Sequence, residues 1–316
     1  MTGSPAPGAE FVAGAHVLRL LAGLVAEGPV PSSYLDWVRL PELAELWPGG
    51  TDPDQDAAAH QDLFGFSVLP YAGVFLDAGD ANGETPSHVA RRYHRAAFDP
   101  GLDDLRPDHL GVELRFVAFL LEHGPSGALE AGAFLDQHLL AWLPSWVFAV
   151  RRQGNARYDQ IAQFVLDWLL EQRRMVERVA DFPLAGRVPA GAEPPALLED
   201  DRTGVRDVAA FLTTPAHCGL FIGRADLARL ARANGTPGGF GQRRLMMENL
   251  LRSAALYDGL DGVFAELVRW IRADAGAWQA LESVPGVGPW SESWRSRLAG
   301  TTLLLNSIQN RLADAP

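Results

Sequence analysis

Three side chains that could do chemistry stand close together within residues 107–116. Asp108 follows a proline, and an acid there suits the first turn of a helix, so one interpretation of Asp108 is a helix cap. His109 and Glu113 lie four residues apart and would share one helical face. They could form an internal hydrogen-bonded pair, or supply two zinc ligands for a metal-dependent hydrolase. A zinc site needs three or four ligands, and no HExxH or CxxC pattern accompanies the pair, so we expect no bound metal.

Two further segments accompany this one. The upstream residues 69–76 contain Pro-Tyr followed by Phe-Leu, and the downstream residues 134–144 contain His138 and Trp142. In this order and spacing, the three segments resemble the TorD/DmsD family of chaperones, whose Pro-Asp-His motif precedes a helix with Glu-Leu-x-Phe. The residues that match this motif are Pro107, Asp108, His109, Leu110, Glu113, Leu114 and Phe116. The resemblance extends over residues 57–170.

The resemblance implies an all-helical, cytoplasmic chaperone and not an enzyme. Family members bind the twin-arginine signal peptide and the apo-form of a molybdopterin-containing oxidoreductase. They hold the precursor back from export until its cofactor is inserted, and we expect no cofactor bound to the chaperone itself. Because the Asp-His pair of the family takes part in peptide recognition, the resemblance implies this role for Asp108 and His109, and Glu113 matches the same pattern.

The chemistry of the peptide is compatible with these residues. Two guanidinium groups require carboxylates for charge-assisted hydrogen bonds, and the apolar run behind them requires an apolar groove. Negative charge near one predicted helix start comes from Asp103, Asp104, Asp108 and Glu113. The candidates for the apolar wall are Tyr71, Trp142 and Trp146. For both tryptophans, packing in the core is the commoner alternative, because tryptophan is highly buried on average.

The composition restricts the partners of the protein. The formal net charge of −12 disfavours nucleic acid and anionic membranes, and every one of the 27 basic residues is arginine. The apolar stretch 11–25 is interrupted by His16 and Arg19, so it predicts neither a secretory signal nor a membrane insertion. A single cysteine, Cys218, excludes an internal disulfide and fits a reducing compartment.

Helical periodicity predicts an all-α fold: a TorD-like helical bundle with additional C-terminal helices. In the N-terminal half, the predicted helices are 11–26, 108–122, 128–143 (with Pro144 ending or kinking it) and 158–179. In the C-terminal half they are 224–233, 243–257, 262–273 and 290–308. Proline and glycine gather at 181–207 and predict a linker there. The predicted organisation is a chaperone domain at 1–180, this linker, and a helical extension at 208–316. Both a monomer and a homodimer are compatible with the sequence.

Three other patterns have simpler explanations. Residues 281–288 resemble the turn of a helix-hairpin-helix nucleic-acid-binding module, but acids flank them and the chain is acidic, so a turn between two helices is favoured. Glycines at 238–241 precede a helix start and lack a Walker A sequence. The Cys218 thiol could be a nucleophile beside His217, but a buried, unreactive thiol is commoner.

Overall fold

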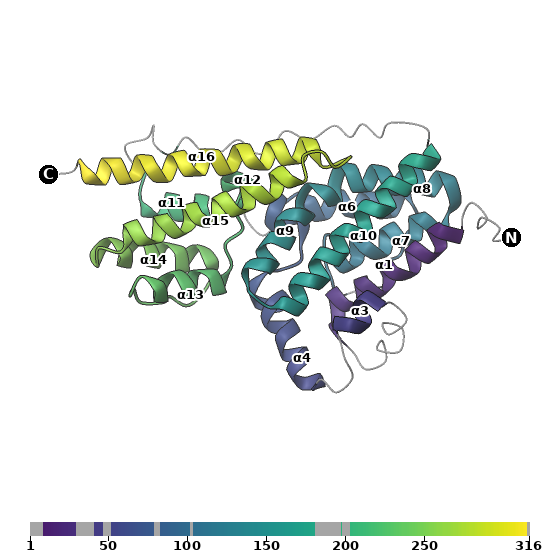
Figure 1. Ribbon diagram of the computed structural model, residues 1–316, viewed down its shortest axis with the longest axis horizontal. Coiled ribbons are helices and arrows are strands. Elements are labelled where there is room, and N and C mark those ends of the chain that lie inside the picture. The colour runs from purple at the N-terminus through teal and green to yellow at the C-terminus, as the bar shows by residue number, and fades with distance from the viewer. Residues whose placement is uncertain are drawn as a thin grey trace. The chain divides into compact units, whose positions relative to one another are not determined.

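The computed structural model describes residues 9–29, 41–46, 52–78, 83–101, 104–180, 197 and 203–314. Helices joined by turns make up these residues (Figure 1). In place of a sheet, the described chain has an isolated antiparallel bridge between Tyr71 and His109. The prediction of an all-α fold is therefore confirmed.

The chain divides into two compact units. The first unit contains Met1–Gly73 and Gly83–Val188, and the second contains Val74–Asn82 and Pro189–Pro316. A short segment from the first half of the chain thus belongs to the second unit. Most of the predicted linker lies outside the described residues, so its extent and the predicted domain limits stay predictions.

The first unit is a helical bundle around α7 (Leu110–Glu122), which packs on α1 and α8. The helix α7 is apolar on most faces, as its sequence indicates, and nearly all of its side chains are buried. The other elements are α1 (Ala9–Glu27), α3 (Pro41–Leu46), α4 (Pro53–His60), η2 (Gln61–Ser67), α5 (Ala72–Leu76), α6 (Thr85–Arg95), α8 (Gly124–Phe134), η3 (Leu135–Leu139), α9 (Leu140–Arg152) and α10 (Ala156–Ala180). Of these, α5 begins in the first unit and continues into the second.

A glycine allows α1 to lie close against α7. A Cβ atom on Gly111 would stand 2.9 Å from the backbone carbonyl oxygen of Ala22 and 3.0 Å from the Cβ of Ala26. A side chain at this position would have to push the two helices apart. The glycine is the second residue of α7, so α1 packs closely against the first turn of that helix.

The segment 128–143 differs from its prediction. The helix α8 passes through the π-helical turn η3 into α9, and Pro144 lies inside α9, so the alternative in which this proline ends the helix is wrong. Proline has no N–H to donate, so the regular helical hydrogen bond from residue 144 cannot form. The burial of α9 on almost every face keeps the helix continuous through Pro144 as far as Arg152.

The second unit contains α11 (Val205–Leu212), α12 (Pro215–Cys218), α13 (Arg224–Ala233), α14 (Arg243–Leu256), α15 (Leu260–Ala280) and α16 (Gly288–Ala313). The four helices predicted here are confirmed, and α15 and α16 lie side by side (Figure 1). Trp278 stacks on Trp294 between them, with 5.8 Å separating the ring centroids. Phe75 stacks on Phe221 at 5.1 Å, which anchors the segment 74–78 within this unit.

A buried ion pair joins α10 to η3 in the first unit. Arg173 donates from Nε to Asp136 Oδ1 at 2.9 Å and from Nη2 to Oδ2 at 3.1 Å. Both side chains are buried, with exposed fractions of 4% and 3%. The neighbouring Arg174 faces solvent instead, where it pairs with Glu171.

We expect Arg173→Leu to lower the free energy of unfolding by about 3–5 kcal/mol, because it removes the guanidinium from a buried carboxylate. The matched control is Arg174→Leu, which breaks an exposed pair and should cost less than about 1 kcal/mol. Chemical denaturation of both variants measures the difference. Equal losses at the two positions would contradict a structural role for the buried pair.

Candidate functional site

Two loops of the first unit run antiparallel and meet at the start of α7. The N–H of Leu110 donates to the Pro70 carbonyl at 2.8 Å, and the N–H of Ala72 donates to the Asp108 carbonyl at 2.9 Å. These backbone bonds hold the loop before α5 against the loop before α7. The predicted upstream segment and the Pro-Asp-His segment are therefore neighbours in space.

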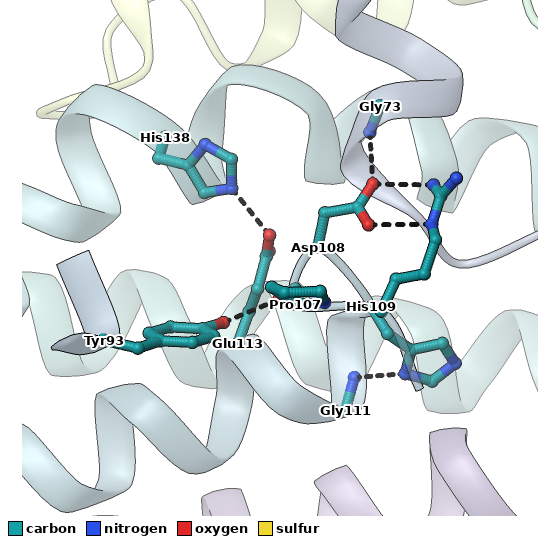
Figure 2. A network of polar contacts seen from close by, with 9 residues as sticks. Gly73, Tyr93, Pro107, Asp108, His109, Gly111, Glu113 and His138 are labelled. Carbon is teal, nitrogen blue, oxygen red and sulfur yellow. Dashed lines mark hydrogen bonds and ion pairs between the residues drawn. The ribbon is translucent and has the colours of Figure 1, made fainter. Parts of the chain in front are cut away.

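The Asp108 carboxylate is completely buried where these two loops meet. Its Oδ1 accepts from Arg106 Nε at 3.1 Å, and its Oδ2 accepts from Arg106 Nη2 at 2.9 Å. The Gly73 N–H also donates to Oδ2 at 2.9 Å (Figure 2). The Arg106 guanidinium lies over the Tyr71 ring, with Cζ 4.7 Å from the ring centroid. Asp108 is thus the anion of a small guanidinium-binding arrangement.

His109, and not Asp108, caps α7. Its Nδ1 accepts from the Gly111 N–H at 3.1 Å (Figure 2), and its ring packs edge-on against Tyr71 at 4.8 Å. Burial, followed by the positive charges of His60 and Arg106, lowers the pKa of His109 to about 4. At neutral pH the ring is therefore uncharged, which leaves Nδ1 free to accept the capping bond.

Glu113 pairs with a histidine that is distant in sequence. His138, on η3, places Nε2 2.6 Å from Glu113 Oε1 (Figure 2). The carboxyl group is fully buried, and this burial raises the pKa of Glu113, although His138 and a hydrogen bond from Trp142 act in the opposite direction. The proposed internal pair of His109 and Glu113 does not form, because each side chain has a different partner.

Tyr93 ties α6 to the same loop. Its hydroxyl donates to the Pro107 carbonyl at 2.8 Å (Figure 2). Burial raises the pKa of Tyr93 well above its ordinary value, and the nearby carboxylates of Glu113 and Asp108 raise it further. The hydroxyl therefore stays protonated and can act as a donor.

The residues predicted for peptide recognition lie in this region at different depths. Tyr71 is half-buried, whereas Asp108, His109, Glu113 and Trp142 are buried. Trp146 is buried as well, so both tryptophans occupy the core position that was the commoner alternative. Asp104 is exposed, and Asp103 lies outside the described residues.

Three contributors to the site were not assigned a role from the sequence: Arg106, the Gly73 N–H and the side chain of His138. A signal existed for His138, because a polar residue in an apolar helix, like the buried Glu113, needs a partner. The pairing of Arg106 with Asp108, two residues away, depends on the shape of the turn closed by the His109 N–H and the Arg106 carbonyl, at 3.0 Å. No spacing rule predicts that contact.

The described residues bear on four other kinds of site: a metal site, a reactive thiol, a nucleic-acid-binding turn and a membrane-spanning helix. They contain no group of three histidine, cysteine or acidic side chains arranged to hold a metal ion. Burial raises the pKa of the Cys218 thiol to about 12, so it is not a reactive thiolate. Residues 281–287 form the turn between α15 and α16. None of the helices in the described ranges combines the length and apolar character that crossing a membrane requires.

Comparison with known proteins finds relatives of the stretch that contains the site. The family model of the nitrate reductase delta subunit matches residues 39–147, which include the crossing loops, α7 and most of α9. A stretch of 128 residues is 38% identical to the chaperone protein TorD of three Vibrio cholerae serotype O1 strains. This part of the chain is similar to the nitrate reductase delta subunit family and to the TorD chaperones.

The match to the TorD chaperones is partial in both directions. It covers 36% of this chain and 56% of each relative, so the chain spans about half the length of the curated relatives it matches. No solved structure matches the chain. The second unit lies almost wholly outside the stretch that the nitrate reductase delta subunit model matches.

We expect His109→Asn to flatten the pH dependence of stability between pH 6.5 and 4. In that window the unfolded histidine binds a proton that the folded one does not, so the free energy of unfolding falls as the pH falls, by roughly 3 kcal/mol for this group. Asparagine keeps an acceptor for the Gly111 N–H and does not titrate.

Thermal melts of the wild type and of His109→Asn at a series of pH values measure the effect. Glu113 contributes with the opposite sign, because its raised pKa removes stability as the pH rises, but it is present in both proteins. Parallel curves for the two proteins would show that His109 is not held neutral.

Proposed function

We propose that this protein is a chaperone that binds the twin-arginine signal peptide and the apo-form of a molybdopterin-containing oxidoreductase. In this proposal it acts in the cytoplasm and holds its client until the cofactor is inserted and export can begin. The similarity of residues 39–147 to the nitrate reductase delta subunit family, and of a 128-residue stretch to TorD chaperones, supports the general role. The details of peptide and client binding rest on the site around Asp108.

One observation carries the peptide-binding part of the proposal. The Asp108 carboxylate already holds a guanidinium group, through two hydrogen bonds and beside the face of an aromatic ring. A carboxylate in this geometry matches the planar fork of an arginine side chain and discriminates against lysine, whose ammonium cannot form the two parallel bonds. Selection of arginine over lysine is the property that a receptor for a twin-arginine sequence needs.

The other predicted residues have supporting positions in this proposal. His109 begins α7 and packs against Tyr71, so it holds the aromatic face in place. Glu113 and Trp142 lie in the interior behind the loop, where the Glu113–His138 pair links α7 to η3. We therefore expect Asp108 and Tyr71 to contact the peptide, and His109, Glu113 and Trp142 to position them.

We expect Asp108→Asn to weaken binding of a synthetic twin-arginine leader by about tenfold or more, because the amide loses the charge-assisted, two-bond contact with a guanidinium. Isothermal titration of the full chain measures the dissociation constant. The leader should come from a molybdoenzyme encoded beside this protein, and a twin-lysine version of the same peptide should bind as weakly to the wild type as the native leader binds to the variant.

The matched control is Asp104→Asn, an exposed acid four residues earlier on the same loop. It removes the same charge and should leave the affinity nearly unchanged. Circular dichroism and thermal melts verify that both variants fold. If the wild type binds neither leader, or binds both equally, the proposed peptide recognition is wrong.

A further inference from the structure

The group that covers Asp108 is more accessible than Asp108 itself. The Arg106 side chain is 44% exposed, whereas the Asp108 side chain has no exposed surface. Arg106 is therefore the member of the ion pair that solvent reaches. A cation arriving from solvent can therefore meet the carboxylate only by taking the place of Arg106.

The features that hold the Arg106 guanidinium do not depend on Arg106 remaining there. The Gly73 N–H holds Oδ2 of Asp108 at 2.9 Å, and the backbone pairing of the two loops fixes the Asp108 main chain. The Tyr71 ring also packs edge-on against His109. An arginine from another molecule would find the same carboxylate and the same aromatic face.

We propose that Asp108, Tyr71 and the Gly73 N–H form a subsite for one guanidinium group, which Arg106 fills in the free protein and a leader arginine fills in the complex. This inference rests on the proposed function and adds a regulatory residue to it. Arg106 acts as an internal competitor, so the apparent affinity for the leader is reduced by the fraction of molecules in which Arg106 occupies the subsite.

Replacing Arg106 with another arginine costs little free energy. In the described part of the chain, the Arg106 guanidinium contacts Asp108 and Tyr71, and it is already partly hydrated. Its release returns it to water, and in the complex the incoming arginine pairs again with the buried carboxylate. The pair between Arg173 and Asp136 has the same two-bond geometry, but both of its members are buried, so that arginine cannot be exchanged with solvent.

The first test compares leader binding by Arg106→Ala and by the wild type, using isothermal titration of the full chain with the synthetic twin-arginine leader. Removal of the competitor should tighten binding by about tenfold. The control is Arg115→Ala, which removes an equal charge from a partly exposed pair with Glu27 and should leave the affinity within about twofold. Unchanged or weaker binding by Arg106→Ala overturns the inference.

The second test asks whether the vacated subsite accepts a free guanidinium. Methylguanidinium at low millimolar concentration should raise the melting temperature of Arg106→Ala, and an equal concentration of methylammonium should not. The double variant Arg106→Ala/Asp108→Asn should respond to neither compound. Equal responses to both compounds would mean that the site does not recognise a guanidinium group.

A third measurement uses the wild type and does not depend on a variant that folds poorly. The NMR signal of the Arg106 Nε–H, identified by its loss in Arg106→Lys, should shift and exchange faster with water when the leader is added. Leader binding that leaves this signal unchanged overturns the exchange and leaves the proposed function standing. If no protein binds the leader but methylguanidinium still stabilises Arg106→Ala, the proposed function fails and the guanidinium subsite remains.

Discussion

A carboxylate removed from solvent must be compensated by hydrogen-bond donors, and Asp108 has both a guanidinium and a backbone amide. This requirement accounts for much of the surrounding structure. The amide comes from Gly73, so the loop before α5 must lie against the loop before α7. The same crossing places Tyr71 beneath the guanidinium and against His109, whose ring in turn begins α7. One buried charge therefore organises two loops and a helix terminus.

The two buried acids near the start of α7 have different partners. Asp108 is matched by an arginine at the surface, whereas Glu113, deeper in the bundle, is matched by His138. Burial raises the pKa of Glu113, so this second contact depends on where a proton resides between the carboxyl and the imidazole. The outer acid is suited to exchange partners, and the inner one to hold α7 against η3.

The helices could be predicted from sequence because their apolar residues repeat at helical spacing, as α7, α10 and α13 show. The path through Pro144 could not, because local rules allow the proline either to end or to kink the helix, and in the structure the buried helix α9 continues through it. In the site, the residue types at Asp108, His109 and Glu113 predicted a group of polar side chains at the start of α7, and the structure places them there. Their partners could not be assigned, because the contacts of Arg106 and Gly73 depend on the conformation of loops, and that of His138 on the packing of η3 against α7.

The passage of residues 74–82 into the second unit has a consequence for biosynthesis. Phe75 is fully buried, and it stacks on Phe221, which leaves the ribosome much later. During translation the nascent first unit must carry this apolar segment without its final neighbour. Completion of the C-terminal helices is then what covers this apolar segment, so a chain interrupted before residue 221 would leave the Phe75 ring of α5 without its aromatic neighbour and exposed to cellular quality control.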